Sequence, residues 1–137
     1  MAGITLGTRT DPGWRISGFP GTSPTLLHIS VDLTPGGPVI TLVGELDVAT
    51  ASAVRACFEV FDVRHAPRLV VDVARLSFCD CAGLSAFLHA HRRARVSDGW
   101  FRLCAASPRL RKMIAITGLA STLRCYPTAA DAFADVE

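Results

Sequence analysis

The sequence lacks the features of several functional classes. None of its 137 residues belongs to an apolar run long enough to cross a bilayer, and the N-terminus lacks the charged head and apolar core of a signal peptide. The formal net charge is only +2, and no basic block alternates with aromatic residues, which argues against nucleic acid as a partner. We therefore expect a cytoplasmic protein that neither enters a membrane nor binds nucleic acid.

Signatures of metal sites and disulfide frameworks are also missing. The five cysteines are an odd number, and none forms a CxxC pair or a Cys/His pattern with the spacing of zinc ligands. We expect no metal, no cofactor and reduced thiols that mostly act as small apolar side chains. Half of the residues are hydrophobic, so a chain of this length can close a core without such links.

The first part of the chain differs in composition from the rest. Residues 1–24 are rich in Gly, Thr, Ser and Pro, and we predict that they form a flexible leader to a single domain over 25–137. An alternative is that this leader is a short docking segment that uses Trp14 and Phe19.

Within the domain the hydrophobic pattern changes between strand and helix. Two strands joined by a Pro-Gly-rich turn open it, and helices then alternate with strands, the first helix being capped by Thr50. The predicted strands are 26–33, 39–43, 69–73, 100–104 and 123–126, and the helices begin near residues 50, 82, 108 and 129. This order predicts an α/β fold, a small mixed four- to five-stranded sheet packed with about four helices and containing a right-handed crossover.

One strand-to-helix junction stands out as a candidate functional surface. The apolar strand at 69–73 leads through Phe78-Cys79-Asp80-Cys81 into a helix whose Leu84, Phe87, Leu88 and His91 share one face. A helix start exposes unpaired backbone N–H groups and the positive end of the helix dipole. Such a helix start is a natural site for an anion or a phosphate, and we place the functional surface there.

Four separated motifs resemble those of the STAS domain, and the nearest branch is that of the bacterial anti-sigma-factor antagonists. The motifs are Gly44-Glu45-Leu46-Asp47, Val71-Asp72-Val73 with Phe78 to Leu84, Thr117-Gly118-Leu119, and Ala132-Phe133. The resemblance implies a STAS-like fold and a non-catalytic regulator. Such a regulator binds an anti-sigma factor, often a serine kinase of the histidine-kinase-like ATPase fold, and thereby releases a sigma factor.

The resemblance also implies a partner-binding surface and a switch. The surface would consist of Asp47, Asp80, Cys81, Ala82, Gly83 and Leu84. In the family, a kinase phosphorylates the serine that immediately precedes the glycine, but this chain has Ala82 there, which has no hydroxyl group. We predict that the protein is not switched by phosphorylation at the usual site, with Ser77 and Ser85 as nearby alternatives.

A redox switch at the same place is a second hypothesis. Its candidates are Cys79, Cys81 and Cys104, and the alternative is that these side chains simply pack. The helix start favours a thiolate at Cys81, which makes it the best candidate. Asp80 is expected both to cap the helix and to contact the partner, and Asp47 to do one or the other.

Two other functions stay open from the sequence. STAS domains also serve as accessory subunits of membrane transport systems, although the motifs look more like the regulatory branch. An enzyme with Cys79 or Cys81 as its nucleophile is the third hypothesis, but no His or acid is placed by the sequence to activate the thiol. His91 is expected to face the core, and His89 to lie outside with Arg92 and Arg93.

Overall fold

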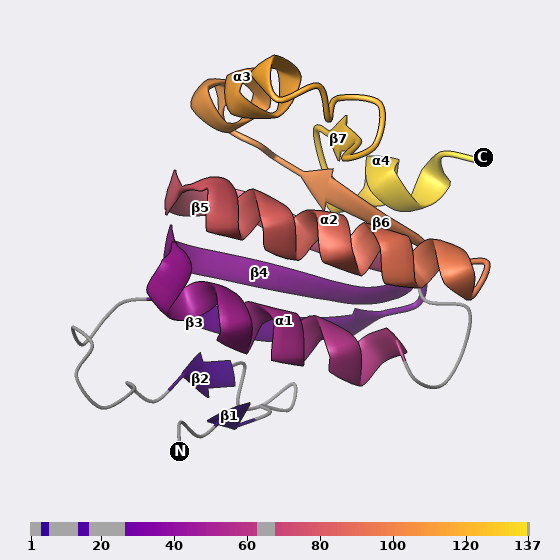
Figure 1. The fold of residues 1–137 in the computed structure, drawn as a ribbon. Helices are drawn as coiled ribbons and strands as arrows, with labels where there is room; N and C mark the ends of the chain where they lie inside the picture. Colours follow the sequence, from indigo (N-terminus) through magenta and orange to yellow (C-terminus); the bar gives the residue numbers. More distant parts are fainter. Residues whose placement is uncertain (1–3, 6–13, 17–26, 63–67, 137) are drawn as a thin grey trace.

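The computed structural model describes residues 4–5, 14–16, 27–62 and 68–136 of the chain. One 7-stranded sheet runs through this part, and its strands lie in chain order (Figure 1). The strands are β1 (Ile4–Thr5), β2 (Trp14–Ile16), β3 (Leu27–Thr34), β4 (Gly37–Leu46), β5 (Arg68–Cys79), β6 (Trp100–Cys104) and β7 (Cys125–Tyr126). The helices are α1 (Val48–Asp62), α2 (Cys81–Val96), α3 (Pro108–Ile116) and α4 (Ala129–Ala134). The predicted α/β fold, with β3 to β7 as its sheet and four helices, is confirmed.

The connections follow from strand direction. β3 and β4 form the predicted antiparallel hairpin, whereas β4, β5, β6 and β7 run parallel to one another. Parallel neighbours need a crossover, and α1, α2 and α3 supply the three that join them. Both α1 and α2 consequently start at the same edge of the sheet, where β4 and β5 end.

The largest differences from the predicted boundaries are at the ends of two strands. β4 continues to Leu46 instead of ending near residue 43, and β5 continues to Cys79 instead of ending near residue 73. Register shifts occur in the β4–β5 ladder between Thr41 and Val43 and between Gly44 and Glu45. These irregularities interrupt the period-two alternation by which a strand is recognised, and so they hid the ends of both strands.

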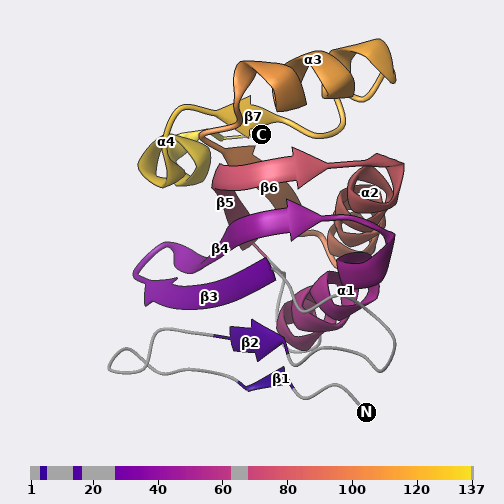
Figure 2. The same cartoon turned by 90° about the vertical axis from the view of Figure 1, so that its left-hand side faces the viewer.

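The main core lies between the sheet and the helices α1, α2 and α3. Its centre holds Phe58 of α1, Phe87 of α2 and Phe101 of β6, whose ring centroids lie 5.4 to 6.3 Å apart. All three side chains are buried, as are Leu110 and Ile114 of α3. Figure 2 shows α1 and α2 together on one face of the sheet and α4 on the other.

The short helix α4 is held to the opposite face partly by a buried cation. Arg102 of β6 is only 2% exposed, and its guanidinium carbon lies 3.9 Å from the ring centre of Trp100. Its Nη1 donates to the backbone carbonyl oxygens of Ala132 at 2.6 Å and Asp135 at 2.8 Å. These carbonyls belong to the end of α4, where the helix dipole is negative and a cation is stabilising.

Part of the predicted leader forms strands. β1 and β2 pair with each other, and β2 pairs with β3, where Trp14 is opposite Ile29. The physical reason is that β3 is otherwise an edge strand with unpaired N–H and C=O groups, which a neighbouring segment can satisfy. Phe19, the other aromatic residue of the predicted docking segment, lies outside the described residues.

Candidate functional site

The ends of β4 and β5 and the starts of α1 and α2 form one edge of the molecule. Leu46 is opposite Cys79 in the parallel ladder, so the next residues, Asp47 and Asp80, follow two neighbouring strands. The Asp80 N–H donates to the carbonyl oxygen of Leu46 at 3.2 Å, which joins the two turns. The structure thus brings Asp47 to the same edge as the 80–84 turn.

Asp47 caps α1. Its Oδ1 accepts from the N–H groups of Ala49 at 2.9 Å and Thr50 at 3.2 Å, and the Thr50 Oγ1 accepts from the Asp47 N–H at 3.0 Å. This reciprocal arrangement is a capping box, with aspartate at the cap and Thr50 three residues on. The prediction of Thr50 as the cap was therefore wrong, because either residue type can cap and only the backbone path decides between them.

Asp80 caps α2, as predicted. Its Oδ1 accepts from the N–H of Gly83 at 3.1 Å, and the carboxylate is half-buried. A carboxylate at a helix start also interacts favourably with the dipole. With two acidic caps side by side and the exposed Glu45 next to them, the edge has a negative character.

Gly83 lies where the turn packs most tightly. An added Cβ would stand 2.7 Å from the Cys79 Sγ and 2.8 Å from the Leu46 Cγ, both well inside ordinary contact. Gly83 is buried, and Leu84 is only 4% exposed and belongs to the main core. These two of the six residues predicted for the partner surface therefore support the turn from beneath instead of facing outward.

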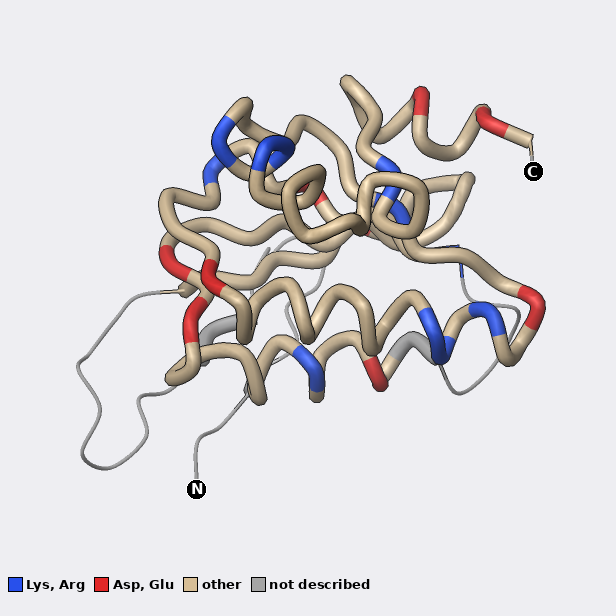
Figure 3. The backbone as a smooth tube through the Cα atoms, turned by 45° about the horizontal axis from the view of Figure 1, so that its top comes forward, with Lys and Arg blue, Asp and Glu red and all other residues tan. Residues whose placement is uncertain are grey.

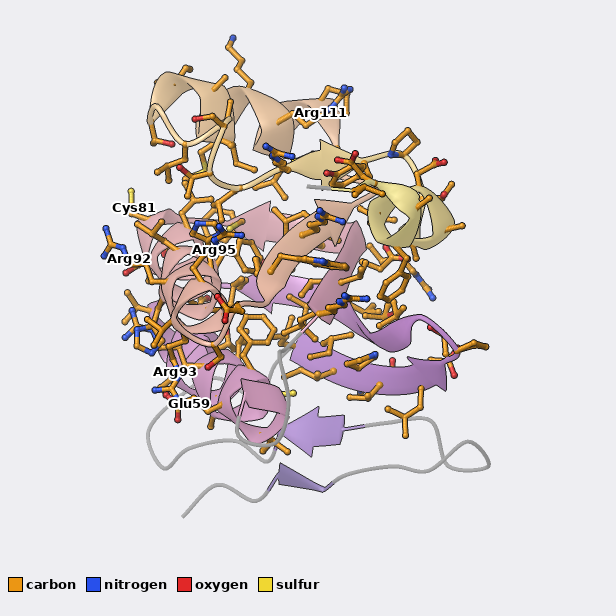
Figure 4. The ribbon with its side chains drawn as sticks, turned by 90° about the vertical axis from the view of Figure 1, so that its right-hand side faces the viewer. Glu59, Cys81, Arg92, Arg93, Arg95 and Arg111 are labelled. Carbon is orange, nitrogen blue, oxygen red and sulfur yellow. The ribbon has the colours of Figure 1, made fainter. Side chains whose placement is uncertain are left out.

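Cys81 and Ala82 are the accessible residues of the turn. Cys81 is exposed, and its side chain points away from the body of the molecule (Figure 4). Ala82 is half-buried and packs against the main core on its inner side. A larger or charged group at Ala82 would have to project outward.

The other two thiols of the redox hypothesis, Cys79 and Cys104, have raised pKa values. Burial, together with the neighbouring Asp80, raises the pKa of Cys79 to about 12. Burial, with a contribution from Asp72, likewise raises the pKa of Cys104 to about 12. With these raised pKa values both thiols stay protonated near neutral pH. They react slowly there, because the thiolate is the reactive form.

The two serines near the turn are engaged differently. The Ser77 Oγ donates to the carbonyl oxygen of Gly44 at 2.9 Å and so ties β5 to β4. Ser85 is exposed on α2, and its Oγ accepts from the Nη2 of Arg55 on α1 at 3.0 Å. Ser77 precedes the turn on β5, and Ser85 lies three residues after Ala82 on α2, so a phosphate on either would occupy a different position in the chain from Ala82.

The charged strip on α2 lies toward the far end of the helix. Arg92 and Arg93 are exposed, as predicted, and Figure 4 shows them on the outer side of α2. His89 is half-buried, with its Nε2 3.6 Å from the Glu59 Oε1 of α1. His91 is half-buried as well, which agrees with a residue at the boundary of the core.

Sequence reasoning missed a cleft next to the turn. It lies between the end of β5 and the start of α3, and Phe78 at its rim is 46% exposed. The only sequence signal for this cleft was the position of Phe78 in a motif. The approach of α3 to β5 depends on tertiary packing, which local sequence patterns do not reveal. Among the described residues no group of three or more His, Cys, Asp or Glu side chains could hold a metal ion, and no helix is long and apolar enough to span a membrane.

Similarity to known proteins agrees with this architecture. A profile of the STAS domain matches residues 28–132, and the chain therefore belongs to the STAS domain family. The anti-sigma-B factor antagonist of Listeria monocytogenes is 32% identical over 84 residues, which are 61% of this chain and 74% of that protein.

Two solved structures share the fold. An anti-sigma factor antagonist from Mycobacterium paratuberculosis is 29% identical, with a TM-score of 0.71 over 81% of this chain and 94% of that one. The Bacillus cell fate determinant SpoIIAA in its phosphorylated form is 26% identical, with a TM-score of 0.60 over 76% of this chain and 95% of that one.

Proposed function

We propose that this protein is a non-catalytic anti-sigma factor antagonist, which binds an anti-sigma factor and so releases a sigma factor. Family membership and the names of its relatives support this role. The observation that carries it here is the turn Asp80–Gly83, which lies at an open edge of the sheet with Cys81 exposed and Ala82 half-buried. The anti-sigma factor is proposed to have the kinase-like ATPase fold, and sigma-factor control requires a cytoplasmic location.

The proposed contact surface consists of the outward groups of this edge. Asp47, Asp80, Cys81 and Ala82 would meet the partner, while Gly83 and Leu84 hold the turn in place from below. Surface carboxylates that also serve as caps are fixed in position by their backbone hydrogen bonds. A fixed polar group loses less conformational entropy on binding than a free side chain does.

A binding experiment tests this role. Each anti-sigma factor of the source organism is purified and screened against the full chain, and one of them is expected to bind. Ala82→Glu puts charge and bulk on the surface and should abolish binding, whereas Ala56→Glu on the exposed side of α1 should leave it unchanged. Failure of every anti-sigma factor to bind would contradict the proposal, and recovery of a transporter ATPase in a pull-down would favour the transport alternative.

We further propose that the usual phosphorylation switch is absent. A phosphate adds nearly two negative charges and would oppose docking next to the acidic caps, but Ala82 offers no oxygen to accept it. In the presence of a kinase-type anti-sigma factor and ATP, mass spectrometry should find no phosphate on the natural chain. Ala82→Ser should gain one, since it restores the hydroxyl at the same helix position. Stoichiometric phosphate on Ser77 or Ser85 of the natural chain would contradict this.

The redox hypothesis places control at this edge on Cys81. It is the exposed thiol of the turn, whereas burial raises the pKa of Cys79 and of Cys104 to about 12. Oxidation would add polar atoms beside Ala82 and change the contact surface much as a phosphate does. Binding of the anti-sigma factor by peroxide-treated natural chain and by treated Cys81→Ser measures this effect, and equal affinities would remove the redox hypothesis.

A further inference from the structure

The end of β5 projects past its neighbour on one side. β6 pairs with β5 only from Arg68 to Asp72, whereas β5 continues to Cys79. In the described part of the chain no strand lies beside that projecting end on the β6 side. The chain instead leaves β6 and turns into α3, which lies above the end of β5 (Figure 1). The sheet is therefore open on one side immediately before the Asp80 turn.

A small cleft fills the space between β5 and α3. It has a volume of about 40 Å³ and is lined by residues 76–79 of β5 and by Ser107, Arg109, Leu110 and Met113 at the start of α3. One buried water needs only about 10–15 Å³ by the same kind of measure, so the cleft has room for a small side-chain group. Leu76 and Met113 supply apolar walls, and the exposed face of Phe78 forms the rim. An exposed aromatic side chain next to an apolar pocket is typical of the centre of a protein interface.

The charges on the two sides of the cleft are opposite. On the α3 side, Arg109, Arg111 and Lys112 are exposed, and the helix contains no acidic residue. On the other side are Glu45 and the carboxylates that cap α1 and α2. Figure 3 shows this separation, with acidic residues at the helix starts and basic residues on α3. Opposite charges on either side of a pocket orient a partner and select one direction of approach.

We propose that this cleft is the second half of the docking surface, and that it takes a short aliphatic side chain of the anti-sigma factor. The side chain would be flanked by an acidic residue, which meets Arg109, and by a basic residue, which meets the caps of α1 and α2. The inference rests on the proposed function and extends its surface from the Ala82 turn across Phe78 onto α3. It assigns partner selection to α3, a helix outside the predicted site.

Two substitutions and one control test the proposal in the full chain. Phe78→Ser removes the apolar rim and Arg109→Glu reverses the charge, while both side chains are exposed enough to leave the fold intact. Arg92→Glu is the matched control, since it makes the same charge change about 16 Å along α2 from the turn. Affinity is measured by calorimetry against the anti-sigma factor that the screen recovers, and thermal melting checks that each variant is folded.

The expected result is at least a tenfold loss of affinity for Phe78→Ser and for Arg109→Glu, with Arg92→Glu within twofold of the natural chain. If Ala82→Glu blocks binding but Phe78→Ser and Arg109→Glu bind normally, the inference is overturned while the proposed function stands. If no anti-sigma factor binds, the function itself fails. If the protein is a dimer that Arg109→Glu makes monomeric, the occupant is a second copy of the chain and the proposal is wrong.

Discussion

Replacement of Gly83 by alanine tests how the turn is built. Gly83 lies in the first turn of α2 with an ordinary helical backbone, so its role is to leave space and not to permit an unusual conformation. The added methyl group would lie 2.7 Å from the Cys79 Sγ and 2.8 Å from the Leu46 Cγ, about 1 Å closer than favourable contact. Leu46 is fully buried, and because protein interiors are close-packed, a shift of its side chain would disturb its neighbours.

Two effects of opposite sign set the magnitude. Overpacking of a filled core costs about 1–3 kcal/mol, whereas alanine is favoured over glycine in a helix by about 1 kcal/mol. The clash should win, because both neighbours are anchored in the β4–β5 ladder. We expect Gly83→Ala to lower the free energy of unfolding by up to about 2 kcal/mol, which lowers the melting temperature by up to roughly 7 °C in a chain of this size.

Chemical and thermal unfolding of Gly83→Ala and of the natural chain measure this loss. Cys81→Ala, an exposed change in the same helical turn, should stay within about 0.5 kcal/mol and serves as the control. Cys79→Ala should be less harmful, or even stabilising, when Gly83 is already alanine, since it removes one of the clashing atoms. A melting temperature equal to or above that of the natural chain for Gly83→Ala would refute the packing argument.

Four further predictions concern the cap of α2, the thiols and α4. Asp80→Ala should cost about 1 kcal/mol of stability through the lost cap, which urea unfolding measures. Asp80→Asn should keep the cap and still weaken anti-sigma factor binding, which calorimetry measures. Binding of Asp80→Asn equal to that of the natural chain would show that the charge of Asp80 is not used. Burial raises the pKa of Cys57 and Cys104 to about 12, so Cys81 should be labelled first by a thiol reagent at pH 7. Above pH 9 Cys57 and Cys104 lose their protons in the unfolded chain but keep them in the folded protein. The free energy of unfolding should therefore fall as the pH rises from about 9 toward 12. A urea midpoint that stays constant over this range would contradict the prediction. Arg102→Met should speed hydrogen exchange in α4 selectively, and unchanged exchange there would show that the carbonyl contacts do not hold the helix.

The fold could be predicted because its signals are local. Ser107 and Pro108 are a cap followed by a proline at the first helical position, and α3 begins where they indicate. Strand β6 coincides with the predicted 100–104. Helical spacing also placed Leu84 on the inward face of α2, which the structure confirms, although the family resemblance had suggested it for the partner surface. Where the two arguments disagreed, the periodicity was the better guide to burial.

The remaining features depend on how distant segments meet. The sequence predicts Thr50 and not Asp47 as the cap of α1, because both members of a capping box are residue types that cap helices. The cleft beside Phe78 arises because β6 is shorter than β5 and α3 returns over the open end. Neither strand length nor the return of a helix leaves a pattern in nearby residues. The exposed position of Cys81 in the turn could therefore be predicted, but not the cleft beside α3.

The two acidic caps have a consequence for how this fold could change its partners. Because β4 and β5 are parallel, α1 and α2 begin side by side at the same edge of the sheet. The positive ends of two helix dipoles therefore lie at the surface that a partner would contact. Asp47 and Asp80 compensate this field while they satisfy the backbone. Serine in their places would also cap the helices but would leave the field uncompensated. One substitution at each cap would thus leave Glu45 as the remaining carboxylate described at this edge opposite two positive dipole ends, and would shift the edge toward anion binding with the core untouched.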